Sequence, residues 1–175
     1  MPLRPGRSYH HIKGRPWTRI SIRVPPKSYV KGVPASKIHQ FEMGSLKTKD
    51  SFPVIFSLAT SEDRRFRTNA LEAARQITTK YLSANLGEMG FFLKIRKFPH
   101  DVLRENPMAT GAGADRFSQG MRQSWGKPIG QAARIYKGGI IMTARVPEGK
   151  EDIVKEALDR ASKKLPGACR VIKGA

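Results

Sequence analysis

The sequence FPVIFSLATSEDRRFRTNALEAARQITTKYLSANLG, residues 52–87, joins two elements whose apolar patterns differ. Residues 52–59 are an apolar run with the length of one strand. The next residues predict a helix from Thr60 to Gly87, because their apolar side chains recur at helical spacing. Thr60 stands three residues before Asp63, as in a capping box, and glycine is a common helix stop. A strand that leads into an amphipathic helix indicates a mixed fold.

The flanking sequence predicts further strands and a second helix. We expect strands at residues 19–24, 90–98 and 169–173, a short helix at 35–43, a hairpin of 131–137 with 140–146 about Gly138-Gly139, and a second amphipathic helix between Pro147 and Pro166-Gly167. Together these elements predict an α+β fold, with an antiparallel or mixed sheet and two amphipathic helices packed on one side of it. The length of 175 residues predicts a single domain.

Residues 99–128, PHDVLRENPMATGAGADRFSQGMRQSWGKP, show no sustained helical or strand periodicity. A structureless loop this long is uncommon inside a compact domain and is usually functional or disordered. Glycines such as Gly111 and Gly113 allow close approach of the backbone to a ligand, and arginines such as Arg116 match phosphate geometry. We interpret the segment as a long internal loop that becomes ordered on a large anionic partner.

The overall charge indicates which kind of partner this is. Lys and Arg number 33 against 14 Asp and Glu, which gives a formal charge of +19. Self-repulsion at this charge favours a polyanionic partner, either nucleic acid or an anionic membrane surface. The sequence has no apolar run of the roughly 18 residues that span a bilayer and no signal-peptide core, so a membrane partner is not expected. The single cysteine, Cys169, excludes an intrachain disulfide and fits a reducing cytoplasm.

Basic residues gather at the N-terminus, where no acid precedes Glu42. Aromatic residues such as Tyr9 and Trp17 are interleaved with them, which is typical of a nucleic-acid-binding arm. We define residues 1–18 as the basic N-terminal arm. The alternative is a disordered basic tail that makes no specific contacts.

Catalytic and cofactor-binding patterns are weak, so we expect no enzyme activity, no cofactor and no metal site. Gly111-Ala112-Gly113 does not follow a strand directly and has Arg116 where a dinucleotide fingerprint needs its third glycine. Cys169 has no obvious histidine beside it and is more simply a small buried residue. His100 is equally compatible with contact to a phosphate or with orienting the loop, and Trp125 with stacking on a base or packing back on the body. Asp115 and Arg116 are most simply an internal ion pair.

The remaining pattern predicts recognition of a folded RNA by shape, through phosphate contacts from several separated elements. The residues expected to contact RNA are the basic and aromatic ones of the arm and the loop, with their neighbours: Arg4, Arg7, Tyr9, His10, His11, Lys13, Arg15, Trp17, Arg19, Arg23, Arg104, Arg116, Arg122, Lys127 and Arg134.

Three segments carry a resemblance to a known family. VLRENPMATGAGADRFSQGMRQSWGKPIGQAARI (residues 102–135), RPGRSYHHIKGRPWTR (residues 4–19) and GGIIMTARV (residues 138–146) resemble the ten-e family of archaeal and eukaryotic large-subunit ribosomal proteins. The bacterial counterpart of that family is protein sixteen of the large subunit. The resemblance covers essentially the whole chain, and it implies an α/β-hammerhead-like sandwich without catalytic activity.

The resemblance also implies a place and a role. It implies a cytoplasmic protein of the large ribosomal subunit that binds ribosomal RNA near the aminoacyl-tRNA site, beside neighbouring ribosomal proteins. The family's internal loop, matched here by residues 104–117, reaches towards the peptidyl-transferase centre, supports tRNA positioning and translation, and is sensed by subunit maturation factors. The loop residues to which this role carries over are Arg104, Asn106, Met108, Gly111, Gly113, Asp115 and Arg116.

Two rival interpretations come from other functional classes. One is an enzyme that acts on RNA and uses the long loop as a lid, which a cofactor pocket or a pair of ionisable residues would favour. The other is a chromatin-like DNA binder, which a preference for duplex DNA over structured RNA would favour.

Overall fold

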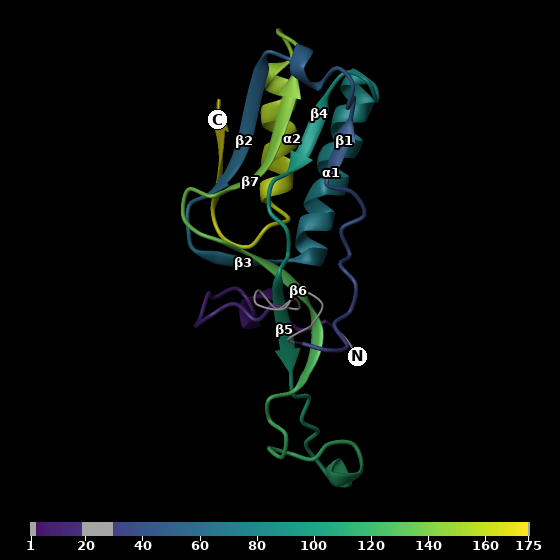
Figure 1. Ribbon diagram of the computed structural model, residues 1–175, viewed down its shortest axis with the longest axis vertical. Coiled ribbons are helices and arrows are strands. Elements are labelled where there is room, and N and C mark those ends of the chain that lie inside the picture. The colour runs from purple at the N-terminus through teal and green to yellow at the C-terminus, as the bar shows by residue number, and fades with distance from the viewer. Residues whose placement is uncertain (1–2, 19–29, 175) are drawn as a thin grey trace.

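Two helices and two antiparallel sheets make up the protein in the computed structural model, which describes residues 3–18 and 30–174 (Figure 1). The elements are β1 (Glu42–Gly44), β2 (Val54–Thr60), β3 (Arg64–Arg67), α1 (Thr68–Leu86), β4 (Phe92–Ile95), β5 (Asp101–Glu105), β6 (Lys127–Ile135), β7 (Ile140–Val146), α2 (Glu151–Ser162) and β8 (Cys169–Lys173), with single 3-10 turns at Gly6–Ser8, Lys49–Ser51 and Ala114–Arg116. The α+β prediction is therefore confirmed. The strand expected at residues 19–24 lies outside the described residues.

The large sheet has the strand order β1-β4-β7-β2-β8, and both helices cover one of its faces (Figure 1). Side chains alternate along each strand, so every second residue points towards the helices. Phe56 and Leu58 of β2, Leu93 of β4 and Met142 of β7 join Leu158 of α2 in one buried cluster. This layer is the hydrophobic core. Neither helix covers the other face of the large sheet, which we call its open face.

Helix α1 begins at Thr68, eight residues later than the capping pattern predicts. The expected start at Thr60 is wrong, because residues 64–67 form β3 and pair with β6, which buries Phe66 completely. The Thr60 hydroxyl donates to the backbone carbonyl of Glu62, so no capping box forms with Asp63. The predicted end is confirmed: Gly87 closes the helix with φ 74°, and its amide donates to the carbonyl of Ser83.

The small sheet has the order β3-β6-β5 and lies beyond the large sheet along the long axis of the molecule (Figure 1). The expected hairpin of residues 131–137 with 140–146 is wrong, because β6 and β7 belong to different sheets. The reason lies at the end of β2. There the Gly138 backbone N–H donates to the Thr60 carbonyl, and the Thr60 backbone N–H donates to the Gly139 carbonyl. These bonds hold the turn against β2 and direct β7 into the large sheet.

Two more predictions differ from the structure. The short helix expected at 35–43 is wrong: the segment is irregular until β1, and the backbone N–H of His39 donates to Glu72 of α1 instead of to a helical carbonyl. The unstructured stretch expected at 99–128 contains β5, whose Val102 and Leu103 are buried, and the start of β6. Residues 106–126, between β5 and β6, contain no strand, and we call them the projecting loop. The second helix and the last strand are confirmed.

Candidate nucleic-acid interface

The N-terminal arm, in its described part 3–18, lies against the small sheet. Thr18 pairs with Asp101 as an isolated antiparallel bridge, and the Val102 N–H donates to the carbonyl of Trp17 at 2.7 Å. Nearer the N-terminus, the backbone N–H of Arg65 donates to the carbonyl of His10 at 2.8 Å. Backbone hydrogen bonds to two strands give this part of the arm a defined path.

Asp101 is the buried centre of this attachment, with 2 % of its surface exposed. Its carboxylate accepts hydrogen bonds from the Trp17 backbone N–H at 3.0 Å, Arg134 Nε at 3.0 Å and Arg65 Nη1 at 3.3 Å. Arg134 also donates to the carbonyls of Gly14 and Lys13, at 2.9 and 2.8 Å. The Asp101 carboxylate therefore binds the guanidinium groups of Arg65 and Arg134, and that of Arg134 also binds the backbone of the arm.

Glu105, at the end of β5, is a second attachment. It forms an ion pair with Arg4 and accepts a hydrogen bond from the Tyr9 hydroxyl at 2.9 Å. Burial and this hydrogen bond raise the pKa of Tyr9 above its ordinary value, so the phenol stays protonated and able to donate at neutral pH. Arg67 donates to the carbonyl of Arg4 at 2.9 Å and lies over the Tyr9 ring.

Trp17 and Trp125 connect the arm to the base of the projecting loop. Their ring centroids lie 4.0 Å apart with an interplanar angle of 31°. The guanidinium of Arg104 lies 5.7 Å from one ring centroid and 5.8 Å from the other, and its Nη1 donates to the carbonyl of Gly126 at 2.8 Å. Gly126 has φ 75°, and a Cβ there would lie 2.3 Å from the Glu105 carbonyl oxygen, so only glycine fits.

The projecting loop extends from the small sheet at the end of the molecule far from the helices (Figure 1). Its turns are closed by its own hydrogen bonds: Asn106 donates to the carbonyl of Gly120 at 3.1 Å, and the Ala109 N–H donates to the Ser118 hydroxyl at 3.1 Å. The Ser118 N–H donates to the carbonyl of Ala114 at 2.9 Å. The loop thus has local structure without packing on the core.

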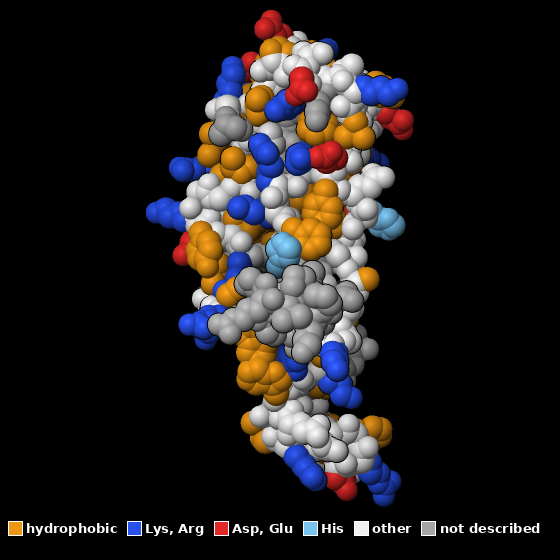
Figure 2. Space-filling model, viewed as in Figure 1, with side chains coloured by type: hydrophobic (Ala, Val, Ile, Leu, Met, Phe, Trp, Pro, Cys, Tyr) orange, Lys and Arg blue, Asp and Glu red, His pale blue; other side chains and the backbone are white. Residues whose placement is uncertain are grey.

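The surface of the projecting loop combines exposed apolar side chains with cations (Figure 2). Phe117 is 86 % exposed and Met121 is 69 % exposed. A hollow of about 470 Å³ lies in the loop, and Arg116, Arg122 and Lys127 are among its lining residues. Aromatic side chains beside guanidinium groups suit unstacked bases and phosphates of RNA.

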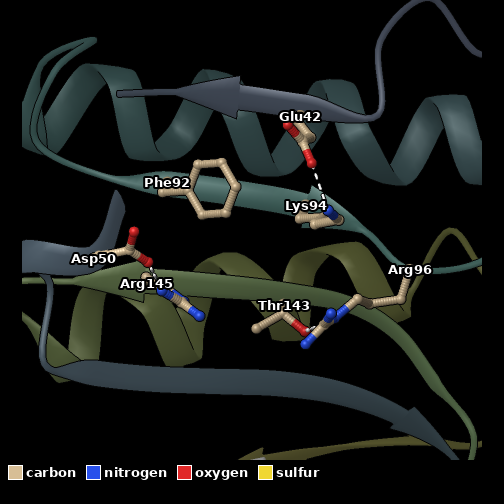
Figure 3. A pocket seen from close by; sticks show the side chains of 7 residues that line it. All are labelled: Glu42, Asp50, Phe92, Lys94, Arg96, Thr143 and Arg145. Atoms are coloured by element: carbon tan, nitrogen blue, oxygen red, sulfur yellow. Dashed lines mark hydrogen bonds and ion pairs between the residues drawn. The ribbon is translucent and has the colours of Figure 1, made fainter. Parts of the chain in front are cut away.

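A second cleft, of about 280 Å³, lies between the arm and the small sheet. Lys13 and Arg15 of the arm line it together with Arg65, Arg104 and Arg134. The open face of the large sheet differs, because its cations already have acidic or hydroxyl partners (Figure 3). There Lys94 pairs with Glu42, Arg145 with Asp50 at 3.0 Å, and Arg96 Nε donates to Thr143 at 3.2 Å.

Known proteins are similar in sequence to this chain over nearly its whole length. The family model described as ribosomal protein L16p/L10e matches residues 15–172. The chain belongs to the L16p/L10e family of ribosomal proteins. It is 48 %, 45 % and 43 % identical to the large ribosomal subunit proteins uL16 of Staphylothermus marinus, Thermofilum pendens and Archaeoglobus fulgidus. These alignments cover 98 % of this chain and 94 %, 97 % and 93 % of the relatives.

The family prediction is confirmed, and it removes the rival interpretation as an RNA-acting enzyme, since these relatives are named as ribosomal proteins.

Burial raises the pKa of the Cys169 thiol to about 11, so it is protonated at neutral pH. Within residues 3–18 and 30–174, no three His, Cys, Asp or Glu side chains are grouped to hold a metal ion. In that same part of the chain, no helix is long and apolar enough to cross a membrane.

In this L16p/L10e protein, most of the sequence-predicted residues gather on the arm, the small sheet and the projecting loop. Those that the structure leaves exposed are Arg4, which is paired with Glu105, and Arg7, His11, Lys13, Arg15, Met108, Asp115, Arg116, Arg122 and Lys127. Arg19 and Arg23 lie outside the described residues. Arg134 and Tyr9 hold the arm by intramolecular contacts, and Arg104 holds the base of the loop.

The geometry bears on several individual expectations. Trp125 packs back on Trp17 but is 62 % exposed, and the exposed His100 ring lies 4.6 Å from that of Phe98, so both alternatives stay open for each side chain. Among the described residues no ion pair joins Asp115 to Arg116, so that expectation is wrong. His11 lies 3.9 Å from His10, ring to ring, and this neighbour lowers the pKa of His11, so a neutral ring suited to stacking is present at neutral pH.

Sequence reasoning missed Arg65, Asp101 and Glu105. The helix expected from Thr60 includes Arg65, which instead lies on β3 and contacts Asp101. One signal was present for Asp101: an acid next to the apolar pair Val102-Leu103 in a very basic chain. A buried carboxylate in such a chain indicates paired arginines, although not which ones.

Proposed function

We propose that this protein is a structural component of the large ribosomal subunit in the cytoplasm and binds large-subunit ribosomal RNA through the arm, the small sheet and the projecting loop. The family supports the ribosomal role, because its similar members are named as large-subunit proteins. The charge of +19 supports an RNA partner, since neutralised phosphates release counterions and favour binding. Neighbouring ribosomal proteins are the other expected partners.

The proposal extends to a position near the aminoacyl-tRNA site, with the projecting loop directed towards the peptidyl-transferase centre. The observation that carries it is the loop itself, which extends away from the core while Arg104 and Trp125 fix its base (Figure 1). A loop with a fixed base and its own internal hydrogen bonds can reach into a crowded RNA site without unfolding the domain. There it supports tRNA positioning and translation, and it offers subunit maturation factors a surface to sense.

Sedimentation of the native protein from a cell lysate through sucrose gradients, at low and high salt, tests the ribosomal role. Co-migration with large subunits that resists moderate salt is the expected result, because many phosphate contacts act together. Migration as a free small protein at low salt would contradict it. In a separate competition assay, duplex DNA that competes for the protein more strongly than ribosomal RNA does would favour the DNA-binding rival instead.

A further inference from the structure

The cleft between the arm and the small sheet holds more positive charge than the described acidic side chains neutralise. Lys13, Arg15, Arg65, Arg104 and Arg134 line it. The carboxylate that reaches these cations is Asp101, and Arg65 and Arg134 share it. Glu105, although on the same strand, is engaged by Arg4 and Tyr9. The cleft therefore carries an excess of cations.

Two buried guanidinium nitrogens at this cleft lack an acceptor. Among the described residues, the Nε atoms of Arg65 and Arg104 are buried without a hydrogen-bond partner, and both side chains line the cleft. Buried donors are normally paired, so an unmatched pair of them in one place calls for an acceptor. Lys13 and Arg15 are exposed at the rim, and within the described residues their side chains make no hydrogen bond or ion pair.

The chemistry of the missing acceptor follows from these donors. A guanidinium group presents several N–H donors in a planar fork. Two of these donors can form parallel hydrogen bonds to the oxygens of one phosphate. The aromatic side chains that line the cleft, Trp17 and Tyr9, already have partners, because Trp17 lies against Trp125 and Arg67 lies over the Tyr9 ring. The cleft is thus equipped to hold a phosphate and not to read a base.

We infer that this cleft is a phosphate-binding pocket that takes one internucleotide phosphate of folded RNA between the arm and the small sheet. The inference rests on the proposed RNA-binding function and adds a specific pocket to it. A phosphate held by Lys13 and Arg15 on one side and by Arg65 and Arg104 on the other also joins the arm to the sheet. RNA binding therefore strengthens the attachment of the arm to the small sheet, to which Asp101 already contributes.

Intrinsic fluorescence offers a direct test, because, of the two tryptophans of the chain, Trp17 lines the cleft and Trp125 lies against Trp17. The full-length protein is titrated with a ribodinucleotide that contains one phosphodiester and, separately, with inorganic phosphate. A saturable change in emission with the dinucleotide, stronger than with inorganic phosphate, is expected. An equal response to inorganic phosphate would overturn RNA as the source of the phosphate, and no response to either would overturn the pocket.

The matched variants separate this inference from the proposed function. Lys13→Gln with Arg15→Gln removes two cations from the rim, and Lys80→Gln with Arg170→Gln removes the same charge from exposed positions on α1 and β8. The plot of log affinity for ribosomal RNA against log salt has a negative slope, and the rim variant is expected to make that slope less steep by about 1 relative to the control variant. Equal slopes for the two variants, while the wild type still binds large subunits, would overturn the pocket alone. Failure of the wild type to bind large subunits would overturn the proposed function as well.

Discussion

The large sheet with its helices and the small sheet with the arm share an apolar core but differ in the interactions that they add to it. The large sheet and its helices bury apolar side chains such as Leu158 and Leu93, which are completely inaccessible. The small sheet holds the arm through two carboxylates, Asp101 and Glu105, and the arginines around them. The small sheet shares the apolar core through residues such as Phe66 and Ile135, and it adds ion pairs that attach the basic arm. Charged residues of the arm and the small sheet can therefore be changed without loss of the buried apolar core.

The largest effect is expected in the core. Leu158→Ala removes a fully buried side chain between α2 and the large sheet, and a cavity there costs about 2–5 kcal/mol of unfolding free energy. Urea denaturation followed by circular dichroism measures the loss. Leu46→Ala, at a residue 54 % exposed, is the matched control and is expected to cost far less. Equal losses in both variants would contradict the assignment of the core.

The second effect is expected at Asp101. Asp101→Asn leaves the guanidinium groups of Arg65 and Arg134 without their carboxylate, and we expect a loss of about 2 kcal/mol, less than the full value for buried pairs because both arginines are partly exposed. Hydrogen exchange of the Trp17 and Val102 amides is expected to accelerate, because the arm separates from β5.

The control for Asp101 is Asp159→Asn, which changes the same group at an exposed position of α2. It is expected to leave both amides protected. Faster exchange throughout α1 and α2 in Asp101→Asn would show that the attachment of the arm and the apolar core are not separable as described.

A smaller, pH-dependent effect is expected at Glu72 of α1. Hydrogen bonds from Arg75 lower the pKa of Glu72 below its ordinary value of 4.5, with further hydrogen bonds from Gln76 and the His39 backbone. Because the folded-state pKa is the lower one, the stabilisation is present above pH 4.5 and is lost as pH falls through the folded-state value.

Urea midpoints measured from pH 7 downwards test this sign. The wild type is expected to lose stability below pH 4.5 more steeply than Glu72→Gln, which has no carboxylate to protonate there. Glu88→Gln, at an exposed position, is expected to follow the wild type. A Glu72→Gln curve parallel to that of the wild type would contradict the linkage.

The smallest effect on stability is expected in the projecting loop. Deletion of residues 108–115 removes none of the buried core residues, so the thermal midpoint and the bulk RNA affinity are expected to stay nearly unchanged. Translation or subunit maturation is expected to be impaired. Unfolding of the isolated protein after the deletion would show that the loop belongs to the core.

The sequence predicts the parts of this fold that depend on local pattern. Helix α2, strand β8 and the end of α1 at Gly87 are visible in the spacing of apolar residues and in the glycine stop. The start of α1 was mistaken because Phe66 fits a helical stripe as well as a strand. Its pairing with Ala133 of β6, 67 positions away in the chain, decides between the two. Such long-range pairing leaves no local signal.

The candidate site was predictable in composition and not in geometry. The cationic and aromatic residues of the arm and the projecting loop are visible as types. Which arginines attach the arm and which stay exposed depends on Asp101 and Glu105, whose partners come from distant segments. Arg134 was therefore expected to contact RNA, although three acceptors in the chain already occupy its guanidinium.

Directed hydroxyl-radical probing tests the central claim most directly, because the chain has a single cysteine that Cys169→Ser removes. An iron chelate is attached through Met108→Cys in the projecting loop or through Lys80→Cys on α1, and each protein is assembled into large subunits. We predict cleavage of ribosomal RNA at the peptidyl-transferase centre from position 108 and none there from position 80. Cleavage from position 108 only at other sites would contradict the account.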